Sequence, residues 1–563
     1  MDSPYATAPL RTRTAFRLLE LSPGCPDDPR IHVTLRNTNL AAAESSFEAL
    51  SYTWGAETPR KPIHCGKSGR EQLEVTLNCY TALLNLRHRR EARVLWIDAI
   101  CINQADMQER NAQVRMMGKI FATASRVVIY LGEHDSDSYD LFQHFAETDV
   151  RIKSGQHPRE LPEPTLAITT RFAKLFERPW FSRVWVIQEL YNARDVLFMC
   201  GNDLASYRAF HSCLFGYQTN TRICTYPPPL TIKFIYKPND FGTCFDEMAF
   251  FLVASSTCQS SDPRDRVLAL TPLITRKSPR LENLVDYTRS VESIFHSLTC
   301  MLLDDLGLVI FKLFTQPHWR KMPTWTLDFS QHIDYEDAAS PLYSPNYRNL
   351  EAGYMTFGKD FSMSEGEIDD TTCRDRLLTV NGVRYGRIEK LSPSIQLPSC
   401  RWQDRETYVQ ELFASLNSMR FGRTLEGWPA SIAQAFQSIR EEEIHKLMVG
   451  HFGDSFLDYS GRKYNDEIIS NIFAMCKSMR IFVTTSYQLG LAPRDAMPGD
   501  VVCLVRGAAS PWIVREKGNE NRTWEMICGD CYLVELRDPP FEEGHLMHEV
   551  ISKHEILEEF KIK

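Results

Sequence analysis

The chain of 563 residues has no apolar run long enough to cross a bilayer, which takes about 18 or more residues without charges. No basic stretch followed by an apolar core opens the sequence, so we expect neither a membrane span nor a secretory signal. Positive charge is not in excess, since the formal net charge is −8, and this argues against nucleic-acid binding. We therefore expect a cytoplasmic protein whose 16 cysteines are reduced.

The common nucleotide- and metal-binding motifs are also lacking. The sequence has neither a Gly-x-Gly-x-x-Gly turn nor a phosphate loop of the G-x-x-x-x-G-K-[S/T] type, so ordinary dinucleotide or ATP binding is not predicted. The C-x-x-C pair at residues 528–531 stands alone, and His64, His88 and His134 lie far apart in the sequence. We expect no metal site and no resident cofactor.

Strand and helix patterns alternate through residues 30–205. Residues 94–97 and 126–131 have the short apolar runs of strands buried on both faces, and the helix between them starts with a capping-box spacing from Asp106 to Glu109. Alternation with short connections favours a parallel, doubly wound sheet. Ligands of such sheets bind beyond the carboxyl ends of the strands.

The pattern divides the chain into three parts. Residues 1–205 form the first domain, with a core at about 47–192 and an insertion at 133–177. Residues 206–365 are predicted to be mainly helical, and residues 366–563 to be an α+β region with a small sheet that includes residues 499–507 and 512–515. The fold class is therefore α/β. We expect residues 206–563 to be a sensing or regulatory part that restrains the first domain.

The most informative segment is R-P-W-F-S-R-V-W-V-I-Q-E-L-Y at residues 178–191. Pro179 is typical of the first turn of a helix, and the residues after it are apolar on nearly every face, so we expect a buried helix. Glu189 lies on this helix, four residues after Trp185. A carboxylate on a buried helix is costly unless it is paired or used, which makes Glu189 the candidate for chemistry.

Four segments resemble, in order, the heterokaryon-incompatibility (HET) domain of fungal proteins. They are F-E-A-L-S-Y-T-W-G at 47–55, L-W-I-D-A-I-C-I-N-Q at 95–104, the E-R and Q-V pairs between 109 and 114, and W-V-I-Q-E at 185–189. Residues 262–273 and 490–536 are similar, more loosely, to parts that often accompany that domain. The resemblance implies a role in non-self recognition and in programmed cell death when unlike fungal cells fuse.

HET domains in turn resemble TIR domains, which have a flavodoxin-like parallel sheet. Catalytic TIR domains hydrolyse NAD with a glutamate in a W-x-x-x-E segment, and Glu189 falls on that position. Residues 95–98 are similar to the TIR strand that ends in an aspartate, whereas the long segment 133–177 departs from the TIR pattern. The resemblance implies a TIR/flavodoxin-like first domain that takes NAD as a possible substrate.

Hydrolysis of NAD at its nicotinamide bond needs no general acid, because the cationic pyridinium departs as a neutral ring. A carboxylate near the ribose stabilises the positive charge of an oxocarbenium-like transition state, and we assign this catalytic role to Glu189. The residues expected to bind the substrate are Trp54, Gly55, Asp98, Asn103, Arg110 and Trp185.

Five of these six residues are expected to bind the substrate for a stated chemical reason. Trp54 or Trp185 offers a flat ring for stacking, Asp98 or Asn103 can bond ribose hydroxyls, and Arg110 can meet a phosphate. Four of them also have a structural alternative, which the sequence leaves open. Trp54 and Trp185 suit core packing, Asp98 can cap the next turn, and Arg110 can form a salt bridge.

Glu189 has its own structural alternative, as a buried acid paired with Arg110 or Arg183. On that interpretation the first domain is a non-enzymatic signalling module. In both cases we expect self-association through the HET domain and a partner that is a non-self or signalling protein.

Overall fold

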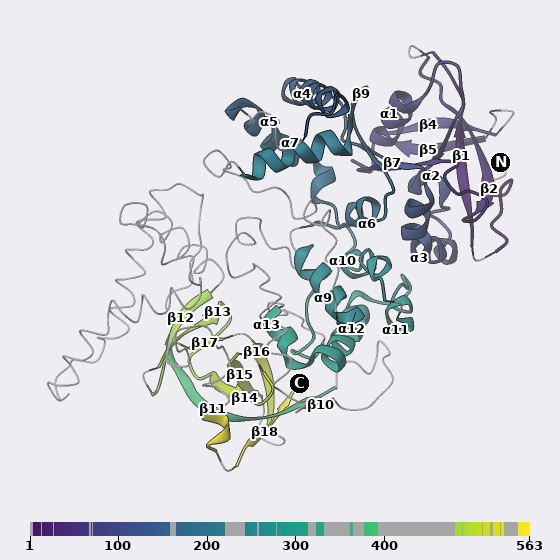
Figure 1. The fold of residues 1–563 in the computed structure, drawn as a ribbon. Coiled ribbons are helices and arrows are strands. Elements are labelled where there is room, and N and C mark those ends of the chain that lie inside the picture. Colours follow the sequence, from purple (N-terminus) through teal and green to yellow (C-terminus); the bar gives the residue numbers. More distant parts are fainter. Residues whose placement is uncertain are drawn as a thin grey trace. The chain divides into compact units, whose positions relative to one another are not determined.

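A computed structural model of the chain is shown in Figure 1. It describes residues 4–12, 14–25, 28–66, 69, 71–157, 165–219, 242–255, 258–276, 278–313, 322–330, 361–363, 376–391, 479–486, 488–508, 510–517, 522–529, 531–533, 550–554 and 556–563. The chain divides into two compact units, Met1–Thr288 and Arg289–Lys563. The three-part division at residues 205 and 365 stays a prediction. Among the described residues, no helix has the length and apolar character that crossing a membrane requires.

The first unit is built on a nine-stranded sheet. In sheet order its strands are β5 (Glu71–Thr76), β4 (Arg60–Cys65), β2 (His32–Asn39), β1 (Ala15–Leu21), β6 (Arg93–Trp96), β3 (Glu48–Tyr52), β7 (Arg126–Tyr130), β8 (Val196–Cys200) and β9 (Asp203–Ser206). Its described helices are α1 (Leu77–Leu86), α2 (Asp98–Cys101), α3 (Met107–Thr123), α4 (Ser136–Lys153), α5 (Leu166–Phe176), η2 (Pro179–Ser182), α6 (Trp185–Tyr191), α7 (Tyr207–Thr219), α9 (Cys244–Ala254), α10 (Asp265–Leu268), η3 (Thr271–Leu273) and α11 (Pro279–Glu282).

The four central strands β6, β3, β7 and β8 run parallel, which confirms an α/β domain with a parallel core. The sheet as a whole is mixed, because β1, β5 and β9 pair antiparallel with their neighbours. From β3 the chain passes to β6 on one side and then crosses to β7 on the other side of β3. The strand order therefore reverses between β3 and β7, and this is where doubly wound sheets bind ligands.

Two local predictions are wrong in detail. Asp106 caps α3 by accepting from the N–H groups of Gln108 and Glu109, but the Glu109 carboxylate turns away from this cap and pairs with Arg17. Pro179 opens the short 3₁₀ helix η2 and not the helix that carries Glu189, which begins at Trp185. The apolar segment after Pro179 is buried as expected, but it folds as two helical pieces.

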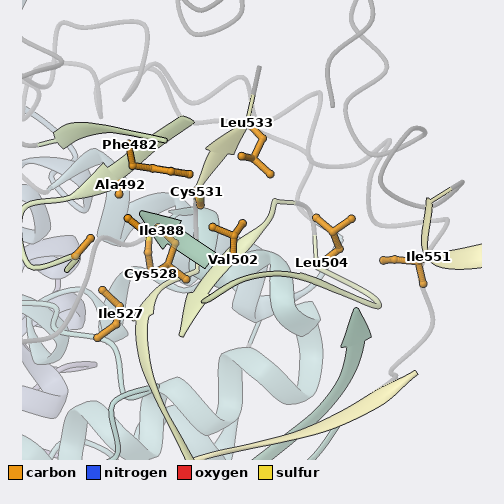
Figure 2. Close-up of a cluster of buried hydrophobic side chains, with 12 residues drawn as sticks. Ile388, Phe482, Ala492, Val502, Leu504, Ile527, Cys528, Cys531, Leu533 and Ile551 are labelled. Carbon is orange, nitrogen blue, oxygen red and sulfur yellow. The ribbon is translucent and has the colours of Figure 1, made fainter. Parts of the chain in front are cut away.

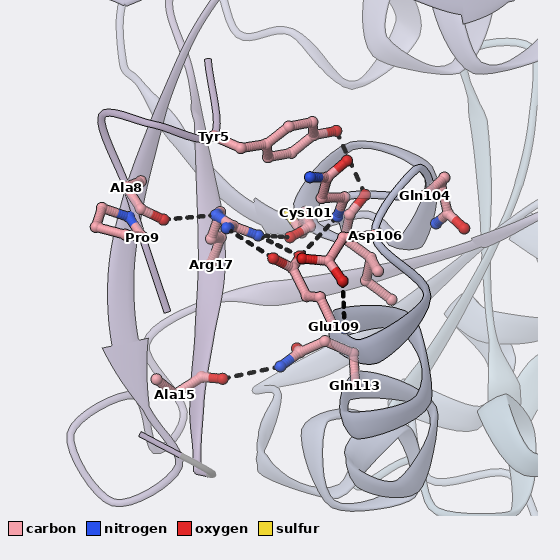
Figure 3. A network of polar contacts seen from close by, with 12 residues as sticks. Tyr5, Ala8, Pro9, Ala15, Arg17, Cys101, Gln104, Asp106, Glu109 and Gln113 are labelled. Carbon is pink, nitrogen blue, oxygen red and sulfur yellow. Dashed lines mark hydrogen bonds and ion pairs between the residues drawn. The ribbon is translucent and has the colours of Figure 1, made fainter. Parts of the chain in front are cut away.

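A buried ion pair ties β1 to α3 (Figure 3). Arg17 is 2 % exposed, and its guanidinium bonds the two carboxylate oxygens of Glu109 at 2.5 and 3.0 Å as well as two backbone carbonyl oxygens. Glu109 also accepts from the backbone N–H of Asn103 at 2.7 Å. The network therefore holds Cys101 at the end of the short helix α2 and Asn103 in the loop after it, and α2 begins at Asp98.

The second unit combines helices with another nine-stranded sheet. Its described helices are α12 (Val291–Leu306), η4 (Gly307–Val309) and α13 (Ile310–Leu313). Its strands are β10 (Phe361–Met363), β11 (Leu378–Leu391), β12 (Met479–Thr484), β13 (Leu489–Pro493), β14 (Val501–Val505), β15 (Trp512–Lys517), β16 (Thr523–Cys528), β17 (Tyr532–Leu533) and β18 (Glu558–Ile562). Helices also predominate in the described part of residues 206–365, as predicted.

Five strands of this second sheet close into a ring, because β11 pairs with both β14 and β18. A cluster of buried apolar side chains includes residues of this ring (Figure 2), among them Ile388, Val502, Leu504 and Ile513. The two adjacent strands predicted at 499–507 and 512–515 are confirmed as β14 and β15, within a larger sheet than expected. Cys528 and Cys531 lie in the same buried cluster.

Substitution Glu109→Ala leaves the guanidinium of Arg17 buried without its counter-charge. We expect the free energy of unfolding to fall by about 3–5 kcal/mol, measured by urea denaturation followed by circular dichroism. The matched control is Glu44→Ala, which removes an exposed pair with Arg194 and is expected to change the same quantity by no more than about 1 kcal/mol. Similar losses in the two variants would contradict a stabilising role for the buried pair.

Candidate functional site

Glu189 lies on α6 against the carboxyl end of β3. Its side chain is 5 % exposed, and one of its oxygens accepts a hydrogen bond from the hydroxyl of Ser51. The same hydroxyl accepts from the indole N–H of Trp180 at 2.7 Å, so Trp180, Ser51 and Glu189 form a buried chain of donors and acceptors. Because Ser51 is the fourth residue of β3, this chain joins the central sheet to the helix.

Burial raises the pKa of Glu189 from its ordinary 4.5 to about 7. The positive charge of Arg183 and the hydrogen bond from Ser51 oppose this rise, whereas the negative charge of Asp98 adds to it. A carboxyl group with such a pKa changes its charge near neutral pH, which suits it to act on a substrate as a base or as a stabilising anion.

Arg183 and Asp98 are the charged neighbours of Glu189. Arg183 donates to the backbone carbonyl oxygen of Tyr52 at the end of β3, and its charge acts on both carboxylates. It forms no ion pair with Glu189, and neither does Arg110, among the contacts of the described residues. Burial also raises the pKa of Asp98, against the opposing effects of Arg183 and of a hydrogen bond from Trp54. Two carboxyl groups with raised pKa values thus share one arginine.

Trp54 and Gly55 form the turn after β3. The indole N–H of Trp54 donates to Asp98 at 2.9 Å, and the tryptophan is 39 % exposed. Gly55 has a φ of +75°, which favours glycine, and a Cβ there would lie 3.3 Å from the Cβ of Asn78 on α1. Asn78 also donates its side-chain amide to the carbonyl oxygen of Thr53, so α1 fixes the turn that presents Trp54.

The structure brings together four of the seven predicted site residues, namely Glu189, Asp98, Trp54 and Gly55. The other three have partners of their own. Asn103 donates its backbone N–H to Glu109 and belongs to the network of Arg17, while Arg110 packs over the ring of Tyr287 at 4.3 Å. The side chain of Trp185 acts on Asp265, whose pKa it lowers. Within the described part of the chain, no three His, Cys, Asp or Glu side chains are arranged to hold a metal ion.

Sequence reasoning missed the residues that hold Glu189 in place. No role for Ser51 follows from the sequence alone, yet its hydroxyl is the hydrogen-bond partner of Glu189, 138 residues away in the chain. No local signal links two residues at that separation. Trp180 carried a weak signal, because a buried indole N–H needs an acceptor. Arg183 was considered only as an ion-pair partner, and it acts on Glu189 through its charge.

Comparison with known families matches residues 47–189 to the family described as heterokaryon incompatibility protein (HET). These residues are a HET domain. The match confirms the resemblance of the four segments, and it ends at Glu189 itself. Over 234 residues the chain is 30 % identical to heterokaryon incompatibility protein 6, OR allele, of Neurospora crassa, a stretch that covers 35 % of this chain. The same stretch spans 34 % of that relative, about a third of its length. No solved structure matches the chain.

The raised pKa of Glu189 makes the stability of the HET domain depend on pH. Between its ordinary 4.5 and about 7, the folded protein keeps a proton that the unfolded chain releases. The free energy of unfolding therefore falls as the pH rises through this window, and above it the ionised carboxylate lowers stability by about 3 kcal/mol. The Glu189→Gln variant has no carboxyl group to ionise at this position. The difference between its free energy of unfolding and that of the wild type should therefore increase by about 3 kcal/mol from pH 4.5 to pH 7.5.

Urea denaturation at several pH values measures this difference. The control is Glu57→Gln, which removes an exposed carboxylate and should show a flat difference over the same range. A flat difference for Glu189→Gln as well would contradict the raised pKa.

Proposed function

We propose that the protein is a fungal heterokaryon-incompatibility effector of cell death whose HET domain hydrolyses NAD or a related nucleotide. In this proposal the HET domain acts in the cytoplasm after self-association. The observation that carries it is the Glu189 carboxyl group, buried against Ser51 at the carboxyl end of β3 with a pKa raised to about 7. The name of the Neurospora relative supports the incompatibility role.

The order of the parallel strands supports a TIR/flavodoxin-like fold for the HET domain. Numbered along the chain, the parallel strands β3, β6, β7 and β8 lie in the sheet as 2-1-3-4. This is the flavodoxin-like order up to its fourth strand, and ligands of that fold bind where the order reverses. Glu189 contacts β3, which is one of the two strands at that point.

The proposed reaction breaks the bond between C1′ of the ribose and the pyridinium nitrogen. The electron pair of that bond goes to the nitrogen, so nicotinamide departs neutral and an oxocarbenium-like charge develops on the sugar. The ionised carboxylate of Glu189 stabilises this charge in a dry surround, where electrostatic interactions are strong. Water then adds to C1′ and releases its proton to solvent, which gives nicotinamide and the ribosyl product.

The groups around Glu189 suit the nucleoside end of such a substrate. Asp98 can accept from ribose hydroxyls, and the half-exposed ring of Trp54 can stack on the pyridinium ring. The two carboxyl groups outnumber the single charge of Arg183, which favours a cationic ring over a neutral one. The proposal rests on Glu189, Asp98, Trp54 and Gly55, and the three predicted residues with partners elsewhere are not part of it.

Glu189→Gln is expected to lower the release of nicotinamide from NAD by roughly 100-fold or more, because the amide cannot stabilise the developing charge. Chromatography of nicotinamide over a range of protein concentrations, with and without cross-linking, measures this effect and the dependence on self-association. Glu57→Gln should retain full activity, and melting curves show whether both variants fold.

The contrary outcome is equally specific. If the wild type releases no nicotinamide under any of these conditions, and folded Glu189→Gln kills cells as efficiently as the wild type, the HET domain is a non-enzymatic signalling module. Equal nicotinamide release by the wild type and Glu189→Gln would refute the catalytic role of this residue alone.

The rate should also depend on pH through Glu189. Its ionised form is the active one, so kcat is expected to rise about tenfold per pH unit below the pKa and to level off above about 7. The profile of kcat between pH 5 and pH 9 measures this limb. A rate that is constant from pH 5 to pH 7 would show that the titration of Glu189 does not control the reaction.

A further inference from the structure

Residues 258–287 run from the start of α6 to the side of α3. We call this segment the strap; apart from residue 277 it lies within the described residues. It includes α10, η3 and α11, and its D-P-R-D-R sequence at 262–266 has no part in the site described above. All of the strap belongs to the first compact unit.

One end of the strap is clamped to the backbone that leads into α6. The N–H of Val184 donates to the carbonyl oxygen of Gln259 at 3.1 Å, and the N–H of Gln259 donates to that of Ser182 at 2.5 Å. The two chains thus form a short parallel bridge centred on Arg183 and Gln259. Arg183, which sets the electrostatics of Glu189, is held at this bridge.

The buried carboxylate of Asp265 makes the second attachment of the strap, at Trp185, the first residue of α6. Asp265 is 8 % exposed and accepts from the hydroxyl of Tyr287 at 2.5 Å, and the side chain of Trp185 is near enough to lower its pKa. Burial raises the pKa of Asp265, and the side chains of Tyr287 and Trp185 oppose this rise. Trp185 is one helical turn before Glu189, so this contact fixes the start of the helix that carries the candidate catalytic residue.

The other end of the strap is attached to α3. The guanidinium of Arg110 lies over the ring of Tyr287, and the backbone N–H of Tyr287 donates to the side chain of Asn111 at 3.2 Å. Arg115 donates to the carbonyl oxygen of Val285 at 2.6 Å. The strap therefore joins α6 to a long helix that packs on the sheet.

Helix α6 depends on such support because it is short. It has only seven residues, and no side chain caps its first turn. A helix of this length does not form by itself in water, so its position is set by what it packs against. A displacement of about 1 Å at a catalytic group can lower a rate by as much as 100-fold.

We propose that the strap is a positioning element for the HET site and that Asp265 is its central positioning residue. By holding Trp185 and the backbone of Arg183, the strap sets where Arg183 and Glu189 stand relative to Ser51. The effect on activity rests on the function proposed above, whereas the effect on the order of α6 does not. The chain passes from the strap directly into the second unit at Arg289, so the strap is also the covalent link between that unit and the site.

The test compares Asp265→Asn with Glu282→Gln in the full-length protein. An asparagine keeps the size of Asp265 but has one accepting oxygen in place of two and no negative charge, so it holds the side chains of Tyr287 and Trp185 less firmly. Glu282 is an exposed carboxylate on the same strap, and its substitution is the matched control. Hydrogen–deuterium exchange should increase in the peptide of residues 183–191 in Asp265→Asn only, while peptides of β3 and β7 exchange as in the wild type.

Activity gives a second readout. In Asp265→Asn we expect kcat for nicotinamide release to fall about tenfold with little change in KM, because the strap positions the reacting groups and does not touch substrate. The acid limb of the pH profile should move to lower pH as Glu189 becomes better hydrated. Glu282→Gln should match the wild type in every measurement.

The possible outcomes are distinguishable. If the Asp265→Asn protein folds and its residues 183–191 exchange as in the wild type, the proposal that the strap positions α6 is wrong. If Asp265→Asn does not fold, Tyr287→Phe removes the hydroxyl that donates to Asp265 and should show the same local increase in exchange. If the wild type lacks hydrolytic activity, the proposed function fails, and the exchange experiment still decides whether the strap positions α6.

Discussion

Removing a carboxyl group from water is the constraint on which the candidate site depends. Glu189 accepts a hydrogen bond from one serine hydroxyl and feels the charge of one arginine without forming an ion pair with it. This is too little to offset the loss of hydration, so the pKa rises. A fully paired glutamate would be more stable and chemically inert. The arrangement at Glu189 instead exchanges stability for a group that gains or loses its charge near neutral pH.

The parts of the site come from distant segments, and each is fixed by its own polar contacts. Asn78 on α1 holds the turn that presents Trp54, and the pair of Arg17 with Glu109 holds the end of α2, the short helix that begins at Asp98. The strap holds α6. These supports use separate side chains. The positions of the Glu189 and Asp98 carboxyl groups are therefore fixed independently, by helices in different connections between strands of the same sheet.

Much of the HET domain could be predicted from the sequence, since its signals are local. The apolar runs of β6 and β7 and the cap of α3 at Asp106 are read from neighbouring residues, and Glu189 is conspicuous as an acid in an apolar helix. Asn103 and Arg110 could not be placed in this way. Their partners, Glu109 in the network of Arg17 and Tyr287 in the strap, are set by how distant segments fold back. Ser51 shows the same limit, because a serine in a strand has no local mark of the acid it will contact.

The bridge at Gln259 bears on where this HET domain can be cut or joined to other sequences. A fragment that stops at residue 205 removes the acceptor of the Val184 amide and the donor to the Ser182 carbonyl, and it exposes the Trp185 side of α6. Such a fragment contains every residue of the family match, yet it lacks the groups that complete its own backbone hydrogen bonds. A fragment that keeps these backbone hydrogen bonds extends at least to Gln259, and one that also keeps Tyr287 against Arg110 extends to residue 287, well beyond the end of the family match.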